Sequence, residues 1–495
     1  MSKIIIQNGN MCELDIPLKY AQKLYNEFAI RHPNAFYLRT RQRGMQNWDG
    51  KIHYITKTGQ FKIGLLPKVY DRCIEMGIKP KVVDMRQPLP KVSKVVTNIG
   101  KYKLRPEQEK AVKAVINNKI GDIPFHIGVL DYTVNAGKTL IMSSLYLSYK
   151  KQLKTLLITN DSDWLNQARE EFKQYLPGED ITFVQGKVLN WSNFTIGMVQ
   201  SISRNMRFYQ KELSQIDMVL IDEADQGGSK QYQNVITRLF NTRIRIGLSG
   251  TIYMSKLAKD KVKNMNLECF FGKVLAEFKL KDSIKKGYST KTIVKMVPGK
   301  PWYGNWESDC ISYKEIYDDS ITENKRAWLM AYNRLQWNLN QGRFPALVVC
   351  KHIAHCENLY KFFKKKLGDA YNIAYVHVNT KSKLRQQIMK DFREGKIDIL
   401  VSTTIIARGK NFPKLRYLLN AASMDSQEKS IQFLGRLVRT DKSKKKVYLD
   451  DLHYPGDYLD RHGKHRKQYY QRQELKVILL DKLWRNHPNH SLSQN

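Results

Sequence analysis

The residues best suited to bind a phosphate lie in Thr133–Thr139, which reads T-V-N-A-G-K-T. A Gly-Lys-Thr run that opens a helix places backbone N–H groups and the positive end of the helix dipole against an anion. Lys138 would reach the β- and γ-phosphates of a nucleotide, and the Thr139 hydroxyl would ligate Mg²⁺. The usual pattern has a further glycine five residues before the second one, where this chain has Tyr132. The backbone groups expected to form the phosphate cradle belong to Asn135, Ala136 and Gly137.

Two adjacent acids supply the second half of a nucleotide-hydrolysing site. The run Met218–Asp225 is an apolar segment that ends in D-E-A-D. Ligands of a parallel sheet bind at the carboxyl ends of its strands, so these acids should face the phosphate loop. Asp222 would hold Mg²⁺, and Glu223 would orient and polarise the attacking water. A solvated face explains two acids at the end of a buried strand poorly, so the pair favours nucleotide hydrolysis.

The elements that must position these residues form two α/β blocks. Short apolar runs alternate with helical segments from about residue 100 onward, as expected of parallel strands that are buried on both faces. The sequence predicts two RecA-like parallel-sheet domains in tandem, a small α+β N-terminal domain and a short C-terminal helical extension, with a helix near 475–484. The predicted boundaries are 1–98 for the N-terminal basic domain, 99–290 for the first RecA-like domain, 291–325 for a linker, 326–452 for the second RecA-like domain and 453–495 for the extension.

Composition points to a polyanionic partner. The 495 residues include 84 Lys and Arg against 46 Asp and Glu, a net charge of +38. Nucleic acid is the commonest partner for such a field, because each phosphate contact releases a condensed counterion. A solubilising charge or an anionic membrane surface is the alternative. No apolar run is long enough to span a bilayer, the N-terminus lacks a secretory pattern, and six sparse cysteines suit a reducing cytoplasm.

A basic motif in the second block follows the phosphate loop and the acidic pair along the chain. Gln432–Arg439 reads Q-F-L-G-R-L-V-R, and Arg436 and Arg439 would share one face of a helix. With these motifs the chain resembles the superfamily 2 helicases, and most closely the UvsW-type recombination helicases of tailed phages, which are similar to RecG-like and XPB-like motors. The resemblance implies that both arginines act as arginine fingers on the γ-phosphate of ATP. A basic helix that faces nucleic acid is the alternative.

The resemblance also assigns roles to weaker motifs. Leu104–Val112 resembles an adenine-recognising segment, in which Gln108 would read the base; an ordinary helix start is the alternative. Ser249 and Thr251, in S-G-T where helicases carry S-A-T, would couple hydrolysis to domain closure. Gly409 would contact the nucleotide, although Lys410 replaces the apolar residue usual beside it. The resemblance implies nucleic-acid contacts for Thr159, Gln200, Ser201, Lys351, His352, Thr404 and Arg408.

The segment Cys350–Cys356 holds two cysteines and two histidines within seven residues, which suggests zinc. Four ligands so close in sequence can hardly surround one tetrahedral ion. The segment also follows an apolar strand and starts a helix, where UvsW-type proteins carry a similar K-H-x-x-H. We therefore expect no metal there, and expect its Lys and His side chains to meet a phosphate or pack the domain.

The first block carries its own candidate contacts. Asn47–Lys51, read N-W-D-G-K, resembles a fingerprint of the UvsW-type N-terminal domain. It follows Arg39, Arg41 and Arg43, of which the last two are candidate nucleic-acid contacts. Trp48 would stack on a base or wedge at a junction; the alternative is that it packs a turn made by Asp49 and Gly50.

The sequence therefore predicts an ATP- and Mg²⁺-dependent DNA helicase or translocase of superfamily 2. Its expected substrates are branched or double-stranded DNA from recombination, replication forks or repair, with single-stranded DNA during unwinding. An RNA helicase and an ATP-gated nucleic-acid clamp without turnover are the alternatives. We expect a cytoplasmic monomer, in the host cytoplasm if a phage encodes it, with no membrane contact. The sequence names no protein partner.

Overall fold

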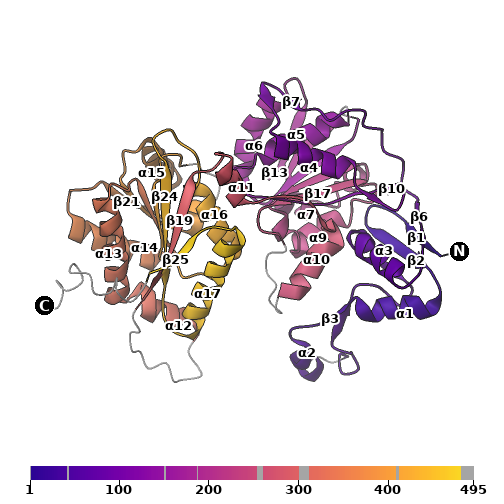
Figure 1. The fold of residues 1–495 in the computed structure, drawn as a ribbon, viewed down its shortest axis with the longest axis horizontal. Coiled ribbons are helices and arrows are strands. Elements are labelled where there is room, and N and C mark those ends of the chain that lie inside the picture. The colour runs from indigo at the N-terminus through magenta and orange to yellow at the C-terminus, as the bar shows by residue number, and fades with distance from the viewer. Residues whose placement is uncertain are drawn as a thin grey trace. The chain divides into compact units, whose positions relative to one another are not determined.

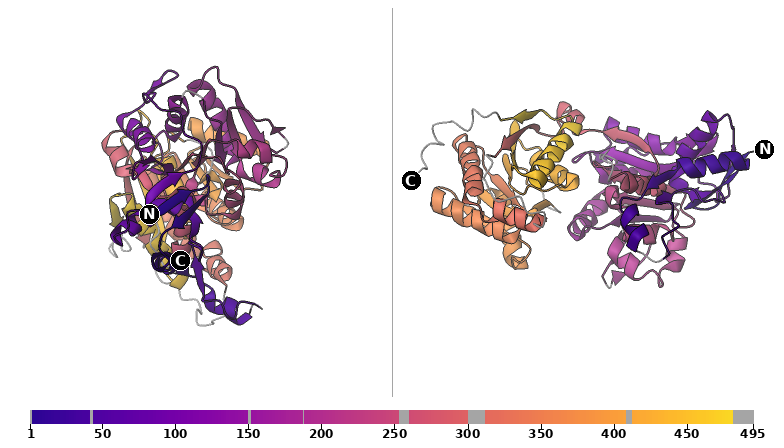
Figure 2. Two further views of the ribbon diagram at one scale, coloured as in Figure 1. Left: turned by 90° about the vertical axis from the view of Figure 1, so that its right-hand side faces the viewer. Right: turned by 90° about the horizontal axis from the view of Figure 1, so that it is seen from below.

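The computed structural model describes residues 2–41, 44–149, 152–186, 188–252, 260–299, 312–407 and 412–480. The chain divides into two compact units, Met1–Phe278 and Lys279–Asn495. Each unit is built around one large, mostly parallel sheet with helices on its faces (Figures 1 and 2). The expected class, two RecA-like α/β sheets with a small mixed sheet at the N-terminus, is confirmed.

The N-terminal sheet has four strands in the order β5-β2-β1-β6. Only the pair β1 and β6 is parallel. Side chains alternate across the sheet, so that Ile4 and Ile6 of β1 are buried. The elements of this part are β1 (Lys3–Ile6), β2 (Met11–Asp15), α1 (Leu18–Glu27), β3 (Ala29–Arg31), α2 (Ala35–Arg41), β4 (Lys51–His53), β5 (Gln60–Lys62), η1 (Ile63–Leu65), α3 (Leu66–Glu75) and β6 (Lys81–Asp84).

The large sheet of the first unit has eight strands in the order β14-β13-β15-β12-β16-β17-β11-β18. All neighbours are parallel except β13 and β14. Its central strands are buried along their whole length, which is why they read as continuous apolar runs. The strands are β11 (His126–Tyr132), β12 (Thr155–Thr159), β13 (Ile181–Gln185), β14 (Val188–Leu189), β15 (Phe194–Met198), β16 (Met218–Asp222), β17 (Ile244–Ser249) and β18 (Val274–Phe278).

Eight helices and two short strand pairs accompany this sheet in the described part of the unit. The helices are α4 (Pro106–Ile116), α5 (Lys138–Ser148), α6 (Ser162–Tyr175), α7 (Val199–Arg204), α8 (Gln210–Ser214), η2 (Ala224–Gln226), α9 (Lys230–Ile236) and α10 (Lys261–Phe271), and the strand pair β7 (Asn98–Ile99) and β8 (Tyr102–Lys103) precedes α4. A second small pair, β9 (Lys119–Ile120) and β10 (Ile123–Pro124), leads into β11.

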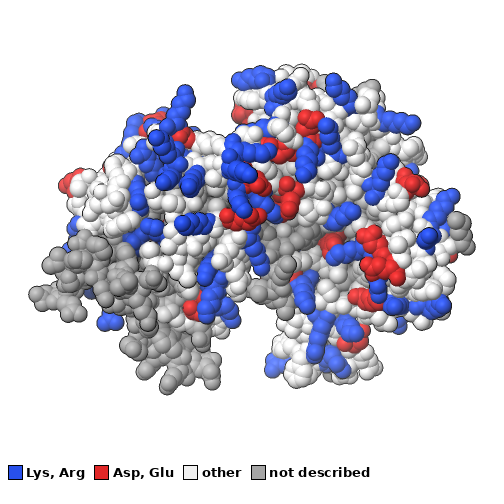
Figure 3. All heavy atoms as spheres, in the orientation of Figure 1, with Lys and Arg blue, Asp and Glu red and all other residues white. Residues whose placement is uncertain are grey.

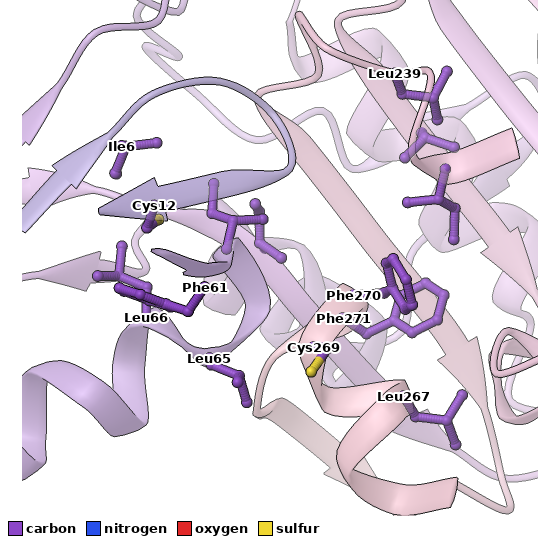
Figure 4. Packing of buried hydrophobic residues seen from close by; sticks show 14 of the residues in the cluster. Ile6, Cys12, Phe61, Leu65, Leu66, Leu239, Leu267, Cys269, Phe270 and Phe271 are labelled. Carbon is purple, nitrogen blue, oxygen red and sulfur yellow. The ribbon is translucent and has the colours of Figure 1, made fainter. Parts of the chain in front are cut away.

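The N-terminal part shares one hydrophobic core with the large sheet. Figure 4 shows Leu65 of η1 beside Cys269 of α10, within a single cluster of buried residues. Arg245 of β17 is fully buried, and its Nη2 donates to the Gly9 carbonyl at 2.6 Å and to Asn10 Oδ1 at 2.8 Å. Residues 1–98, expected to form a domain of their own, therefore lie in one compact unit with the first RecA-like sheet.

Gly64→Ala is expected to reduce the free energy of unfolding of the first unit by about 1–3 kcal/mol, the range for overpacking a filled core. A Cβ at this position would lie 2.1 Å from the Glu268 carbonyl oxygen, which is backbone and cannot move aside cheaply. Chemical denaturation measures the loss. Gly228→Ala is the matched control, because its Cβ would first meet Leu267 Cδ2 at 3.6 Å. Equal stability of the two variants would contradict this tight packing.

The large sheet of the second unit has seven parallel strands in the order β21-β22-β20-β23-β24-β19-β25. Its strands are β19 (Lys291–Pro298), β20 (Ala346–Cys350), β21 (Ile373–Val376), β22 (Ile399–Thr403), β23 (Tyr417–Asn420), β24 (Lys446–His453) and β25 (Val477–Leu479). Its helices are α11 (Leu280–Lys285), α12 (Tyr313–Tyr317), η4 (Asp318–Thr322), α13 (Lys325–Asn340), α14 (Ile353–Leu367), α15 (Ser382–Glu394), η5 (Thr404–Ala407), α16 (Gln427–Leu437) and α17 (Asp457–Arg472).

Two boundaries of the second unit differ from the sequence prediction. The expected linker, 291–325, contains β19, which pairs with β24 along its whole length. The helix expected near 475–484 is replaced over Val477–Leu479 by β25, which pairs with β19 at the sheet edge. In both cases pairing with a strand distant in sequence determines the structure, and local periodicity does not report such pairing.

Candidate functional site

The phosphate loop connects the buried strand β11 to helix α5. Asn135 and Gly137 have positive φ angles of 64° and 71°, which turn the chain sharply before Lys138 opens the helix. Glycine suits position 137, because a φ of 71° is strained for other residues and a Cβ there would also lie 2.3 Å from Nε2 of Gln108. The loop therefore has the local geometry expected of an anion cradle at a helix start.

Tyr132, which stands where the usual pattern has glycine, is part of the core beneath the loop. Its ring is buried, and its hydroxyl donates to the Glu107 carbonyl at 2.7 Å. Gln108 lies next to this bond on α4. Its Nε2 donates to the Ala136 carbonyl at 2.8 Å, and its Oε1 accepts from the Arg105 N–H at 2.8 Å. The predicted adenine-reading residue thus contacts the phosphate loop directly.

The acidic pair lies at the carboxyl end of β16, where the sheet faces the phosphate loop. Asp222 Oδ1 is 3.7 Å from Lys138 Nζ, and the carboxylate is only 7% exposed. Burial raises the pKa of Asp222 above its ordinary value, and the neighbouring Lys138 ammonium opposes that rise. Glu223 has a φ of 52°, a left-handed conformation that is costly for a residue with a side chain and is concentrated at functional sites.

Several buried polar atoms around the loop would gain partners from a bound nucleotide and cation. Thr133 Oγ1, Asn135 Oδ1 and Asp222 Oδ1 have no hydrogen-bond partner among the described residues. Buried polar atoms normally find partners, so this group indicates a ligand site. Oxygen atoms from Asp222 and from Thr139, in the first turn of α5, form a donor set that suits Mg²⁺.

Asp222→Asn is expected to raise the melting temperature of the nucleotide-free protein near pH 7 while abolishing ATP hydrolysis. The raised pKa of Asp222 means that the fold favours the protonated carboxyl, so its ionised form destabilises the fold near neutral pH. The stabilisation should shrink as the pH falls through the pKa of Asp222, where the parent carboxyl is itself protonated. Thermal unfolding at several pH values measures this. A variant less stable than the parent at pH 7 would show that the Lys138 contact outweighs burial.

A hydrogen-bonded chain links the acidic motif to the end of β17. Ser249 Oγ donates to Asp225 Oδ1 at 2.6 Å and lies 3.0 Å from Thr251 Oγ1. The intervening Gly250 lies against the phosphate loop, since a Cβ there would be 3.0 Å from Thr133 Cα. Of the residues expected to couple hydrolysis to closure, Ser249 therefore contacts the acidic motif and Thr251 contacts Ser249, beside the loop.

Three predicted nucleic-acid contacts of the first unit lie near this same sheet edge. Thr159 ends β12, and Gln200 Nε2, on α7, donates to the Asn160 carbonyl at 3.4 Å. Ser201 Oγ accepts from the Gly186 N–H at 2.9 Å. Asn160, which the sequence analysis missed, also donates through Nδ2 to Gln226 just after the acidic motif. Only its place one residue beyond a buried strand could have identified it.

In the second unit the two predicted arginine fingers differ in their local structure. Arg436 is in the last turn of α16, whereas Arg439 follows the helix, which ends at Leu437. The expectation that both share a helical face is therefore wrong. The backbone carbonyl of Arg439 accepts a hydrogen bond from Thr290 Oγ1 at 3.1 Å, which ties this segment to the start of β19.

Lys351, His352 and Thr404 follow the carboxyl ends of β20 and β22. Lys351 Nζ lies 4.0 Å from the centre of the Tyr313 ring, and burial together with Lys429 lowers the pKa of Lys351. His352 packs edge to face on Tyr317, and burial lowers its pKa as well. Thr404 Oγ1 accepts from Lys429 Nζ at 3.5 Å. Arg408 and Gly409 lie outside the described residues.

The cysteine and histidine cluster is built into the core of the second unit. Cys350, His355 and Cys356 are all buried. His355 Nδ1 is 3.2 Å from the Tyr317 hydroxyl, and burial lowers the pKa of His355 to about 3. Within the described ranges no three His, Cys, Asp or Glu side chains are grouped so that they could hold a metal ion.

The N-terminal candidates divide into packed and exposed residues. Trp48 Nε1 donates to the Lys51 carbonyl at 2.9 Å, and its ring meets His32 edge to face, so this side chain packs the turn. Arg41 is exposed on α2, with its guanidinium 5.0 Å from the centre of the Tyr37 ring. Arg43 lies outside the described residues. Over the whole described part of the chain, no helix is both long and apolar enough to cross a bilayer.

Comparison with known families finds two matches, one in each unit. Residues 101–254 match the family described as "Type III restriction enzyme, res subunit", and residues 328–441 match "Helicase conserved C-terminal domain". Together the two matched segments cover just over half of the 495 residues and contain the phosphate loop, the acidic motif and both candidate arginines.

Similar proteins include two from viruses and one bacterial protein of solved structure. Putative helicase 22 of Sulfolobus islandicus filamentous virus (isolate Iceland/Hveragerdi) is 22% identical over 411 residues, covering 77% of this chain and 69% of that protein. The ATP-dependent DNA helicase uvsW of Enterobacteria phage T4 is 22% identical over 448 residues, covering 86% and 85%. The solved fragment of a putative HsdR subunit of a type I restriction enzyme from Vibrio vulnificus YJ016 shares the fold, with 15% identity, a TM-score of 0.55 and coverage of 76% and 67%.

Proposed function

The chain belongs to superfamily 2 of the ATP-dependent helicases, and from this premise we propose that its substrate is DNA in branched or double-stranded form. The observation that carries the choice of DNA is the extent of the match to the phage T4 DNA helicase. The match covers 86% of this chain, so fewer than 98 residues lie outside it. It therefore includes some of residues 1–98 as well as both motor units. Recombination, replication-fork and repair intermediates are the substrates that this proposal covers.

The first unit would hold ATP at the carboxyl edge of its large sheet. The backbone N–H groups of Asn135, Ala136 and Gly137 would cradle the phosphates, and Gln108 would read the adenine edge above them. Lys138 would neutralise the β- and γ-phosphates from the start of α5. Thr139 and Asp222 would hold Mg²⁺, which when bound offsets the charge that develops on the phosphate oxygens.

Hydrolysis would then depend on a positioned water and on cations from the second unit. Glu223, at the end of β16, would orient the water for in-line attack. Arg436 and Arg439 would stabilise the charge that develops on the γ-phosphate. Ser249, which contacts Asp225, and Thr251, which contacts Ser249, would transmit the loss of that phosphate to the rest of the motor.

Nucleic acid would bind through groups at the carboxyl ends of both sheets. Such groups hold the backbone and carry no sequence information, which suits a motor that must pass over any sequence. The residues proposed for these contacts are Thr159, Gln200, Ser201, Lys351, His352, Thr404 and Arg408, with Arg41 and Arg43 from the N-terminal part. Trp48 is not proposed as a base-stacking residue, because its ring and its indole N–H pack the turn.

The test is ATP hydrolysis by the full chain without polymer and with single-stranded DNA, forked DNA, fully paired DNA and RNA at one fixed moderate salt concentration. We expect forked or paired DNA to stimulate ATP turnover more than RNA does. Stimulation by RNA alone would move the substrate to RNA. Absence of hydrolysis with every polymer would favour an ATP-gated clamp. The salt must be fixed because phosphate contacts weaken steeply as it rises.

A further inference from the structure

A projection of the N-terminal part exposes aromatic rings among basic side chains. It is formed by α2 with the two-stranded pair β3 and β4, and it extends away from the shared core of the first unit (Figure 1). Phe36 is 80% exposed and Tyr37 is 56% exposed, although both lie on a helix only seven residues long. Two adjacent exposed rings make this helix a candidate contact surface.

The same projection contains a cavity of about 510 Å³, lined among others by Arg31, Phe36, Arg39 and Lys51. Ligand-binding pockets for small molecules fall in the range of roughly 300–1,000 Å³, so this cavity can take a nucleotide-sized group. The lining combines the aromatic ring of Phe36 with these cations, the carboxylate of Asp49 and several uncharged residues. On the face shown in Figure 3, Lys and Arg side chains gather over this projection.

Cations outnumber acids around the cavity in the part of the chain that the structure describes. No ion pair there involves Arg31, Arg39, Arg41 or Lys51. The one acid of the cavity lining, Asp49, is already engaged: its carboxylate meets His53 Nε2 at 2.7 Å and accepts from the Lys51 N–H at 2.9 Å. These bonds hold the pKa of Asp49 below its ordinary value and shape the turn. The lining therefore carries a net positive charge, with three cations against the single carboxylate of Asp49.

We propose that this cavity receives an unpaired nucleotide at the branch point of the substrate, with Phe36 stacking on its base and Arg31, Arg39 and Lys51 holding its phosphate. Every base presents an aromatic face, so one ring binds any base, while the cations attract the backbone. Arg41, which stacks on Tyr37, extends the same surface. The inference rests on the proposed DNA substrate and assigns to Phe36 the stacking role that the sequence suggested for Trp48.

The charge of the cavity favours a nucleic acid over an apolar protein segment. An apolar partner would bury three cations beside only one carboxylate, and burying charge without a partner is unfavourable. A phosphate satisfies them and lies one nucleotide unit from a base that can stack. Fully paired DNA offers the phosphates but no free base, so the cavity should distinguish a fork from a continuous duplex.

Equilibrium binding without ATP tests this inference. The full chain is titrated with a forked DNA and with a fully paired DNA of equal phosphate number at one salt concentration. Phe36→Ala is expected to weaken binding of the fork about 10-fold, within the range that alanine substitution gives for base–aromatic stacking, and to leave binding of the paired DNA unchanged. Leu18→Ala is the matched control, since Leu18 is 67% exposed in the same part of the chain and should alter neither affinity.

A second measurement uses 2-aminopurine at the unpaired position beside the fork, because its fluorescence reports stacking. The parent and the Leu18→Ala protein should change this signal on binding, and Phe36→Ala should not. The inference would be overturned if Phe36→Ala kept the parent's preference for the fork, or if it lost affinity equally for both DNAs. It would also be overturned if Phe36→Ala lost binding to a protein partner while its DNA binding stayed intact. The proposed DNA substrate fails separately, if neither DNA stimulates ATP hydrolysis by the parent.

Discussion

Lys138→Ala is expected to lower ATP turnover by about 100-fold or more, the range for losing one preorganised group that stabilises transition-state charge. Lys138 is the first residue of α5 and lies 3.7 Å from the buried Asp222 carboxylate, so its ammonium is aimed at the place where phosphate and cation would meet. Alanine removes the charge without disturbing the left-handed Gly137 that shapes the loop.

The same variant should keep most of its affinity for DNA, because that affinity comes from many Lys and Arg side chains over the surface. Steady-state ATP hydrolysis and equilibrium DNA binding, measured in parallel, separate the two properties. Lys113→Ala is a suitable control, since Lys113 is 55% exposed on the neighbouring α4 and pairs with Glu109 at the surface. Unaltered turnover in Lys138→Ala would refute the assignment of the phosphate site.

Arg466→Met is expected to destabilise the second unit by about 3–5 kcal/mol, because removing one partner of a buried ion pair leaves the other charge without compensation. Arg466 lies on α17 and is fully buried. Its Nη2 is 2.8 Å from Asp451 Oδ1, and its Nη1 donates to the Met424 carbonyl at 3.0 Å. The loss should appear as a large fall in the melting temperature of the second unit.

Lys464→Met provides the contrast on the same helix. Lys464 also forms an ion pair, with Asp460 at 2.6 Å, but it is 67% exposed. Exposed pairs contribute about 0–1 kcal/mol, so this variant should unfold close to the parent. A double variant, Arg466→Met with Asp451→Leu, should recover part of the lost stability, because no charge is then buried alone. Equal melting temperatures for Arg466→Met and Lys464→Met would show that α17 is not held by this pair.

The Arg466–Asp451 pair gives the C-terminal region a structural role. From the sequence, residues 453–495 are a basic, polar extension with no assigned role. In the structure Arg466 and Tyr470 of α17 both bond to Asp451 of β24, and β25 extends the sheet beyond it. The described part of this region is therefore a structural component of the second unit, and its histidines and arginines are only partly available to a ligand.

The packing of the N-terminal part determines which experiment can test its role. Treated as a separate basic domain, residues 1–95 could be deleted to test their part in recognising branched DNA. Gly9 and Gly64 lie against the backbone of segments beside the first large sheet, and the Arg245 side chain of β17 donates to the Gly9 carbonyl. Its removal would expose that core, so single substitutions in the α2 projection are the sharper test.

The amino-acid sequence determined the features that depend on local spacing. The phosphate loop, the acidic pair after an apolar strand and the buried parallel strands were all visible, because a strand buried on both faces is apolar throughout and a phosphate cradle needs glycine at a sharp turn. The order of these motifs was enough to indicate the family. Net charge indicated a nucleic acid but not which one, since DNA and RNA offer the same phosphates.

Tertiary structure alone decided which of the remaining residues are available for function. Arg466 and Arg245 look like surface cations in sequence, yet each is buried where a distant segment supplies its partners. Trp48 and Phe36 are both aromatic residues near arginines, but one packs a turn and the other faces solvent beside a cavity. Exposure depends on what the rest of the chain covers, and contacts between residues far apart in sequence leave no periodic signal along it.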